Sequence, residues 1–167
     1  MQIEKLQDRH SVTVWCMVDP TGVVAFDICT ETMNGVRYCG VLTNKVLPYF
    51  RQRQNQNKFY QQDGAPPHYC RAARALLDDH LANRWIGRRG AIEWPPRSPD
   101  LSICDFFFWG ALRDKVYKTT PRTVHQLARQ IEAEITSFPR RMFQAAYTSF
   151  LKRCGDCIDL NGGQVEG

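Results

Sequence analysis

Two aspartates stand where carboxylates could do chemistry. Asp63 follows the strand-like segment 58–62 and precedes a Gly/Pro turn at 64–67. A carboxylate at the C-terminal end of a strand faces the crevice where open α/β sheets bind ligands. Asp105 lies in the first turn of a segment with helical spacing, with 41 residues between it and Asp63. Two such carboxylates can share a hard divalent cation such as Mg²⁺, which prefers oxygen ligands.

The residues alone leave other interpretations open. An Asp before Gly also forms turns without any further role, so Asp63 could be a turn residue. Acidic pairs with a separation like that of Asp63 and Asp105 occur in many α/β proteins. Composition and periodicity therefore predict a mixed α/β domain, in which metal binding is one hypothesis.

Length and composition limit the class of protein. A chain of 167 residues is long enough for one domain with a hydrophobic core. No apolar run approaches the ~20 residues that a membrane helix needs, so no membrane partner is expected. Residues 1–10 are polar and lack the apolar core of a secretory signal. An intracellular location, nuclear or cytoplasmic, is therefore expected.

The charge balance is mildly basic. The chain has 22 Lys and Arg against 17 Asp and Glu, a net charge of +5. This balance is compatible with a nucleic-acid partner and also with many ordinary proteins. Candidates for phosphate contacts are Arg84, Arg88, Arg89 and Arg97, for which a solvated surface is the alternative.

Cysteine spacing does not predict a metal site. Of seven cysteines, Cys154 and Cys157 form a lone CxxC. A structural zinc site needs four ligands, and no second CxxC or HxxxH accompanies this pair. Reduced thiols are therefore expected.

Periodicity and turn residues predict the order of the elements. Segments 11–18 and 23–29 are expected to form an antiparallel hairpin, since both are rich in β-branched residues and a turn joins them. The remaining expectations are a helix over 35–50, a strand ending at 62, a helix after Pro67, a loop at 85–89, a strand at 91–94, and helices near 103, after Thr123 and after Pro139. This order predicts a mixed sheet with helices on its faces.

Several segments resemble one family. QQDGAPPHY (61–69) resembles the QDNAPxH block of mariner-type DDE/D transposases, and the segment beginning PPRSPDLSICD (95–105) resembles their PPYSPDLxPxD block. Segments 12–28 and 34–42 are similar to the strands and helix that precede the family's middle carboxylate. The closing segment 157–167 is similar to the family's Cys…Asn-Gly-Gly tail. The resemblance covers essentially the whole chain in the right order.

The resemblance implies an RNase H-like core in which three carboxylates hold two Mg²⁺ or Mn²⁺ ions. Such enzymes hydrolyse a phosphodiester at a transposon end and join the freed 3′-hydroxyl to target DNA. By motif match, Asp63 is the middle carboxylate and Asp105 the last, both catalytic metal ligands. His68 matches the motif histidine at the edge of the active site, although a surface or helix-start role stays open. DNA is the implied partner, and a homodimer is left open.

The chain also departs from the family pattern. Gly64 replaces the usual Asn after the middle Asp. In the family the first carboxylate lies on the central strand upstream of the segment that matches 12–28, and residues 1–10 do not resemble that strand. The other candidate acids, Asp8, Asp19 and Asp27, do not match the first motif. The expected fold is therefore an α/β, RNase H-like mixed sheet flanked by helices and lacking the first, central strand.

These observations predict one partial catalytic domain, truncated at its N-terminus, over 1–167, with a polar leader at 1–10, C-terminal helices over 123–153 and a tail at 160–167. The function implied by ancestry is that of a DDE/D endonuclease or transposase, with cleavage impaired because the first carboxylate is missing. Whether the chain is an enzyme stays open. The alternatives are an active endonuclease with a surrogate acid, and a non-catalytic nucleic-acid-binding or interaction module derived from a transposase.

Overall fold

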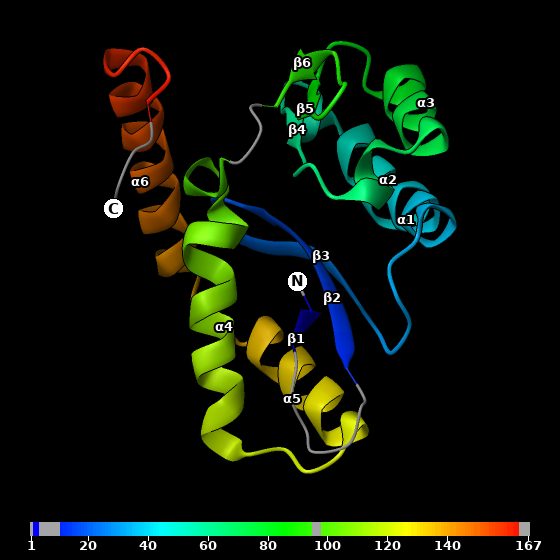
Figure 1. Cartoon of the computed structure of the whole chain (residues 1–167), viewed down its shortest axis with the longest axis vertical. Coiled ribbons are helices and arrows are strands. Elements are labelled where there is room, and N and C mark those ends of the chain that lie inside the picture. Colours follow the sequence, from blue (N-terminus) through cyan, green and yellow to red (C-terminus); the bar gives the residue numbers. More distant parts are fainter. Residues whose placement is uncertain (1, 4–10, 95–97, 164–167) are drawn as a thin grey trace. The chain divides into compact units, whose positions relative to one another are not determined.

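The computed structural model describes residues 2–3, 11–94 and 98–163 (Figure 1). The chain divides into two compact units. The first comprises Met1–Thr32 and Ser98–Gly167, and the second comprises Met33–Arg97. Each unit holds its own three-stranded sheet. The assignment of residues 1–167 to a single partial domain stays a prediction.

The first unit contains the predicted hairpin. Strands β2 (Val12–Asp19) and β3 (Gly22–Cys29) pair antiparallel. The turn between them is fixed by Asp19, whose Oδ1 accepts hydrogen bonds from the N–H and the hydroxyl of Thr21, at 2.7 and 2.6 Å. Gly22 follows with φ of +134°, a conformation that glycine adopts without steric cost. The strands expected at 11–18 and 23–29 are confirmed.

A short strand precedes this hairpin. Strand β1 (Gln2–Ile3) pairs antiparallel with Val12 and Thr13 at the start of β2, which makes it an edge strand of the sheet β1-β2-β3. This short pairing was not among the elements expected from the sequence, and the polar leader at 1–10 stays a prediction. The pairing depends on the backbone N–H and C=O groups that an unpaired edge of β2 would expose.

Three helices complete the first unit. Helix α4 (Trp109–Val116) continues from a π-helical turn at Cys104–Phe108, and a 3₁₀ turn at Tyr117–Thr119 ends it. Helix α5 (Val124–Thr136) starts at Thr123, whose hydroxyl accepts the N–H of Gln126 at 3.1 Å, as the capping pattern predicts. Helix α6 (Arg140–Asp159) follows Pro139. The helices predicted near 103, after Thr123 and after Pro139 are confirmed.

The core of the first unit is built from β2, the π turn and the three helices. Helices α5 and α6 pack against β2 and β3, and Figure 1 shows α5 beside these strands. The rings of Phe108, Phe138 and Phe143 contact one another with centroids 5.2–5.5 Å apart. The buried members of this core are Val12, Val14, Cys16, Phe108, Leu112, Val116, Leu127, Ile131, Ile135, Phe138 and Phe143. Because Phe108 ends the π turn and is fully buried, the core fixes the segment that carries Asp105.

The second unit begins with the helix predicted over 35–50. Helix α1 (Gly35–Val41) passes through a π-helical turn at Leu42–Val46 into α2 (Leu47–Arg51), and a 3₁₀ turn follows at Arg53–Asn55. The side chain of Asn34 caps the start by accepting the N–H of Arg37 at 2.9 Å. The wider turn precedes Pro48, which has no N–H to donate to the preceding turn.

The sheet of the second unit is parallel. Strands β4 (Tyr60–Gln61), β5 (Trp85–Gly87) and β6 (Ile92–Glu93) pair in that order. A 3₁₀ turn at Pro66–Tyr69 and helix α3 (Arg71–His80) connect β4 to β5. The strands predicted before Asp63 and at 91–94 and the helix after Pro67 are confirmed, although β4 and β6 are short.

The loop predicted at 85–89 was wrong for its first three residues. The main chain of β5 pairs with β4, since the N–H of Tyr60 donates to Arg84 O and that of Gln62 donates to Ile86 O, each at 2.9 Å. Trp85 is fully buried, and its Nε1 donates to Asp78 Oδ1 at 3.0 Å. The burial of this indole stabilises the strand pairing, although Gly87 and Gly90 favour a turn.

Within the described residues the strands form two sheets, one antiparallel and one parallel, and not the single mixed sheet predicted from the sequence. Pro95, Pro96 and Arg97 lie outside the described residues, and Pro99 begins a 3₁₀ turn at Pro99–Leu101. Among the helices that the structure describes, none is both long and apolar enough to cross a membrane.

Candidate functional site

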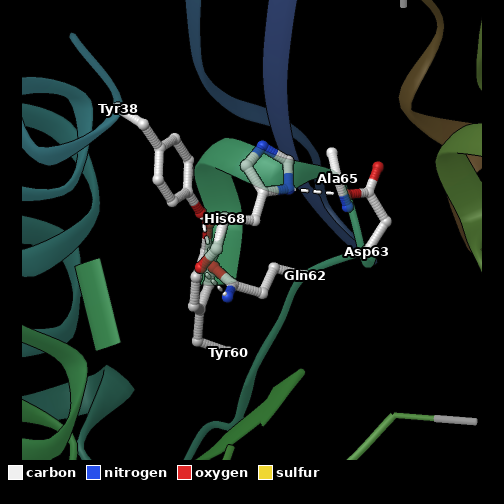
Figure 2. A network of polar contacts seen from close by, with 6 residues as sticks. All are labelled: Tyr38, Tyr60, Gln62, Asp63, Ala65 and His68. Carbon is white, nitrogen blue, oxygen red and sulfur yellow. Dashed lines mark hydrogen bonds and ion pairs between the residues drawn. The ribbon is translucent and has the colours of Figure 1, made fainter. Parts of the chain in front are cut away.

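Asp63 stands just after β4, at the start of the turn toward α3. Its Oδ1 accepts the N–H of Ala65 at 2.9 Å and lies 2.5 Å from His68 Nδ1 (Figure 2). Its Oδ2 makes no hydrogen bond or ion pair within the residues that the structure describes. The side chain is 47% exposed. The turn role and the ligand role are therefore compatible, because one carboxylate oxygen closes the turn and the other is left for a partner.

The surroundings of Asp63 favour its charged form. Burial raises the pKa of the carboxyl group, but the contact with His68 and the hydrogen bond from Ala65 lower it, and the net pKa lies below its ordinary value. The stabilisation from these contacts is therefore present at neutral pH and is lost as the pH falls through the pKa of the folded state. An ionised oxygen donor of this kind suits a hard cation such as Mg²⁺ or Mn²⁺.

His68 reaches Asp63 through the 3₁₀ turn. Its backbone N–H donates to Ala65 O at 2.9 Å. Its ring packs on the ring of Tyr38, with centroids 4.2 Å apart and planes 32° apart, and its side chain is only 14% exposed. The structure thus brings together the two residues that the motif predicted, and a fixed aromatic ring orients the histidine.

A buried polar network lies beneath this turn (Figure 2). The hydroxyl of Tyr38 donates to Gln62 Oε1 at 2.6 Å and lies 2.8 Å from the hydroxyl of Tyr60. Because a hydroxyl has one proton, Tyr60 donates to Tyr38. Gln62 Nε2 donates to the carbonyl of His68 at 2.7 Å, so the network ties the turn to β4. All three side chains are at most 5% exposed.

Sequence reasoning missed this network. Tyr38 lies on α1, 22 positions before Tyr60, and pairing between them cannot be predicted from local periodicity. The available signal was Gln62, a polar residue in the strand-like segment beside Asp63. Buried polar groups must find partners, so a buried Gln here implied a partner from another element. The burial also raises the pKa of Tyr38 well above its ordinary value, which keeps its proton on the hydroxyl.

Replacing Tyr38 with Phe should destabilise the second unit. The variant keeps the ring against His68 but leaves two buried groups, Tyr60 Oη and Gln62 Oε1, each without one bond. We expect the free energy of unfolding to fall by about 1–3 kcal/mol, measured by urea denaturation. Tyr147→Phe, at a partly exposed ring on α6, is the control and should stay within about 0.5 kcal/mol. Equal losses in the two variants would contradict the role of the network.

Gly64 is a departure from the motif that the structure can accommodate. Its φ is not positive, and an added Cβ would meet Arg88 Cδ at 3.7 Å, an ordinary contact. Gly64→Asn should therefore leave the free energy of unfolding unchanged or raise it by up to about 1 kcal/mol, by restricting the unfolded chain. The control is Gly90→Ala, whose Cβ would lie 2.6 Å from the Trp85 ring and should destabilise the unit. Thermal unfolding of both variants measures this, and a loss for Gly64→Asn as large as that for Gly90→Ala would contradict it.

Asp105 belongs to the first unit and lies in the π turn that leads into α4. Its side chain is exposed, and its N–H donates to Ser102 O at 2.9 Å. The π turn is closed by the N–H of Trp109, which donates to Cys104 O. Turns of this kind often accompany functional sites, because they re-aim side chains within a helix.

Arg153 on α6 supports the block that carries Asp105. Its guanidinium lies over the ring of Phe106, 4.5 Å from the centroid, and its Nη1 is 3.5 Å from Asp100 O. Asp100 itself lies in the 3₁₀ turn that starts at Pro99. Sequence reasoning had not connected Arg153 to this block, since the two are about fifty positions apart.

Asp63 and Asp105 lie in different units, so their shared metal site stays a prediction. Within the described ranges, no group of three or more His, Cys, Asp and Glu side chains could hold a metal ion. Of the other acids, Asp19 closes the hairpin turn, Asp27 lies in β3, and Asp8 is outside the described residues. All seven cysteines are free thiols.

The structure separates the four arginines proposed for phosphate contacts. Arg84 donates through Nη1 to the carbonyls of Gln56 and Lys58, at 2.5 and 3.3 Å, and so holds the chain that enters β4. Arg88 and Arg89 are exposed and lie over the ring of Tyr69. Arg97 lies outside the described residues.

Comparison with known proteins gives relatives in sequence. No protein-family profile matches the chain. The Tcb1 transposase of a transposable element of Caenorhabditis briggsae is 29% identical over 154 residues, which cover 91% of this chain and 53% of that protein. The Tc3 transposase of Caenorhabditis elegans is 27% identical over 158 residues, covering 93% and 45%. The chain thus spans about half the length of these relatives.

Solved structures show the same fold. The catalytic domain of the Mos1 mariner transposase superposes with a TM-score of 0.79 at 20% identity, covering 99% of this chain and 81% of that domain. The Mos1 catalytic domain with raltegravir and Mg gives 0.74 at 20% identity, covering 94% and 77%. The Mos1 paired-end complex with Mn gives 0.74 at 20% identity, covering 98% and 48%. The chain is therefore similar in sequence to transposases of transposable elements, and it has the mixed α/β fold of the Mos1 catalytic domain.

Proposed function

We propose that this chain is a DDE/D catalytic domain of transposon origin, which binds DNA and divalent cations and whose phosphodiester cleavage is impaired in the 167-residue polypeptide. The relatives in sequence are transposases of transposable elements. Solved structures of similar fold include a Mos1 paired-end complex and a strand-transfer complex. Transposon DNA is accordingly the proposed partner, the nucleus the proposed location, and a homodimer a further proposal.

The observation that carries the proposal is the geometry of Asp63. Its carboxylate is held ionised at the end of β4 by Ala65 and His68, and Oδ2 has no partner among the described residues. An oxygen donor with this charge fits Mg²⁺ or Mn²⁺, the ions in structures of the Mos1 catalytic domain with raltegravir. Asp105 enters the proposal as a second ligand through its motif alone. When bound, two such ions stabilise the attacking and leaving oxygens in phosphodiester cleavage.

The side chains of His68 and Tyr38 orient the carboxylate of Asp63 for metal binding. His68 fixes the orientation of Oδ1, and the ring of Tyr38 fixes His68 in turn. A ligand whose rotamer is set before the cation arrives loses less conformational freedom on binding. His68 is therefore proposed as a positioning residue at the edge of the site.

The impairment follows from the number of carboxylates. The family pattern has three, and this sequence matches the second and third at Asp63 and Asp105. Two carboxylates oppose less of the charge of two divalent ions than three do, so ion binding and cleavage should both weaken.

The test is nicking of supercoiled plasmid DNA in Mg²⁺ or Mn²⁺ by the 167-residue polypeptide and by its Asp63→Asn variant. We expect nicking by the unmodified polypeptide to be no faster than by the variant. Nicking that disappears in the variant would overturn the impairment and show an active endonuclease with another acid in place of the first carboxylate.

A second candidate is a non-catalytic nucleic-acid-binding module, which the exposed Arg88 and Arg89 beside Tyr69 favour. It predicts salt-sensitive DNA binding that persists in Asp63→Asn, together with no binding of Mn²⁺ by the unmodified polypeptide. Binding of Mn²⁺ that requires Asp63 would exclude this candidate in favour of the first.

A further inference from the structure

Tyr69 carries two arginines on its ring. The guanidinium carbon of Arg88 lies 4.3 Å from the ring centroid and that of Arg89 lies 5.6 Å from it. Consecutive residues of an extended strand point to opposite faces. Here two consecutive residues reach the same ring, so the backbone after β5 must turn between them.

That turn is built around Arg89 in a left-handed conformation, with φ of +59°. Gly87 O accepts the N–H groups of Gly90 and Trp94, at 3.0 and 3.1 Å, and Glu93 Oε2 accepts the N–H of Arg89 at 2.9 Å. This conformation is unfavourable for a residue with a Cβ and would suit glycine. Residues held in an unfavourable backbone conformation often have a functional role, so we expect one at Arg89.

The two guanidinium groups are positioned and available. Both side chains are exposed, and neither forms a hydrogen bond or ion pair within the described ranges. Glu93 is the nearby acid, and its Oε2 accepts a main-chain N–H. A guanidinium stacked on an aromatic ring keeps its N–H groups for an acceptor at its edge. In Arg84, by contrast, Nη1 donates to main-chain carbonyls and is not available to a ligand.

The pair lies beside the turn that carries Asp63. A Cβ added to Gly64 would stand 3.7 Å from Arg88 Cδ, so the stem of Arg88 packs against the residue next to Asp63. An anion held by Arg88 and Arg89 would therefore be bound close to the Asp63 turn.

We propose that Tyr69, Arg88 and Arg89 form a binding site for phosphates of a nucleic-acid backbone next to Asp63. Two neighbouring guanidinium groups on a rigid support match the geometry of a phosphate, which accepts paired N–H donors. The inference deepens the proposed function by naming the residues that hold the substrate backbone near Asp63, and its choice of DNA as ligand rests on that function.

The test measures binding of a short DNA duplex in EDTA by fluorescence anisotropy over a series of salt concentrations. The slope of log K against log salt concentration is negative, and each phosphate contact contributes about 0.9 to its magnitude, which is called the slope below. The double variant Arg88→Ala/Arg89→Ala should therefore lower the slope by about 1.8. The matched control is Arg51→Ala/Arg53→Ala, which removes two exposed arginines of the same unit. An unchanged slope in the first variant, or an equal fall in the control, would overturn the proposal.

Arg89→Gly separates binding from folding. Glycine suits the left-handed backbone, so the thermal midpoint should stay the same or rise, while the salt slope falls by about 0.9. A lower midpoint with an unchanged slope would mean that Arg89 is structural and would overturn the proposal.

The assay needs no metal and no cleavage, so its outcome is independent of the role of Asp63. A slope that falls in the double variant, combined with no effect of Asp63→Asn on Mn²⁺ binding, would support this site and contradict the proposed function. An unchanged slope combined with loss of Mn²⁺ binding in Asp63→Asn would support the proposed function and overturn this site.

Discussion

Asp63→Asn should weaken the binding of Mn²⁺ by at least about tenfold, since removal of a residue that merely orients a metal ligand already costs about 10–100-fold. The substitution keeps the size of the side chain and its ability to accept the N–H of Ala65, while it removes the charge. Folding should therefore be preserved and metal binding lost. Titration with Mn²⁺ followed by electron paramagnetic resonance measures the free ion directly.

The chain offers a matched control in the same unit. Asp79 also lies beside a histidine, with Oδ2 3.2 Å from His80 Nδ1, and its side chain is 80% exposed. Asp79→Asn removes the same charge from an Asp–His pair that does not belong to the transposase-like motif. This variant should leave Mn²⁺ binding unchanged. A loss of equal size in both variants would show that general charge, and not the geometry at Asp63, attracts the ion.

Trp85→Ala should have the largest effect on stability. The indole is fully buried, and its ring is the surface against which Gly90 lies too closely for any Cβ. Removing such a side chain typically costs about 3–5 kcal/mol, because burial is lost and a cavity remains. Trp85 also pairs with Tyr60 in the β4–β5 ladder, so the loss should extend to the turn that carries Asp63.

Urea denaturation followed by circular dichroism measures this prediction. Trp85→Phe is the control, since it keeps an aromatic ring but loses the hydrogen bond from Nε1 to Asp78, worth about 1 kcal/mol. A Trp85→Ala variant within about 1 kcal/mol of the unmodified chain would contradict the central place of this side chain in the second unit.

Elements governed by local chemistry could be predicted from the sequence. The hairpin depends on two β-branched runs and on a turn in which Asp19 bonds its own neighbour, Thr21. Helix α5 depends on Thr123 and on an apolar residue every third or fourth position. In each case the decisive contacts join residues that are close in sequence, so a local sequence pattern predicts the element.

Elements that depend on distant partners could not be predicted. Strand β5 is three residues long, it ends at Gly87, and Gly90 follows soon after, so the segment has the glycines of a turn. Its identity comes from pairing with β4, some 25 positions earlier, and from burial of Trp85. Strand β1 likewise exists through its ladder with β2, and its two residues are too few to show a period.

The site was predictable in part. Asp63 and His68 were both identified through their motif, and in the structure His68 Nδ1 lies 2.5 Å from Asp63 Oδ1, while their roles in a metal site stay a prediction. The supporting network of Tyr38, Tyr60 and Gln62 joins elements that no local pattern relates. Composition likewise treated Arg84 and Arg88 alike, whereas one holds main-chain carbonyls and the other lies on an aromatic ring.

The most direct test of metal binding by the two motif aspartates is a Mn²⁺ titration of Asp105→Asn beside Asp63→Asn. Asp105 is exposed in the π turn before α4 and belongs to the other unit, so its inclusion rests on the motif and on the sequence similarity to transposases. If both residues are ligands, each variant should bind Mn²⁺ at least about tenfold more weakly than the unmodified chain. Mn²⁺ binding that is unchanged in Asp105→Asn would contradict a DDE/D metal site in this protein.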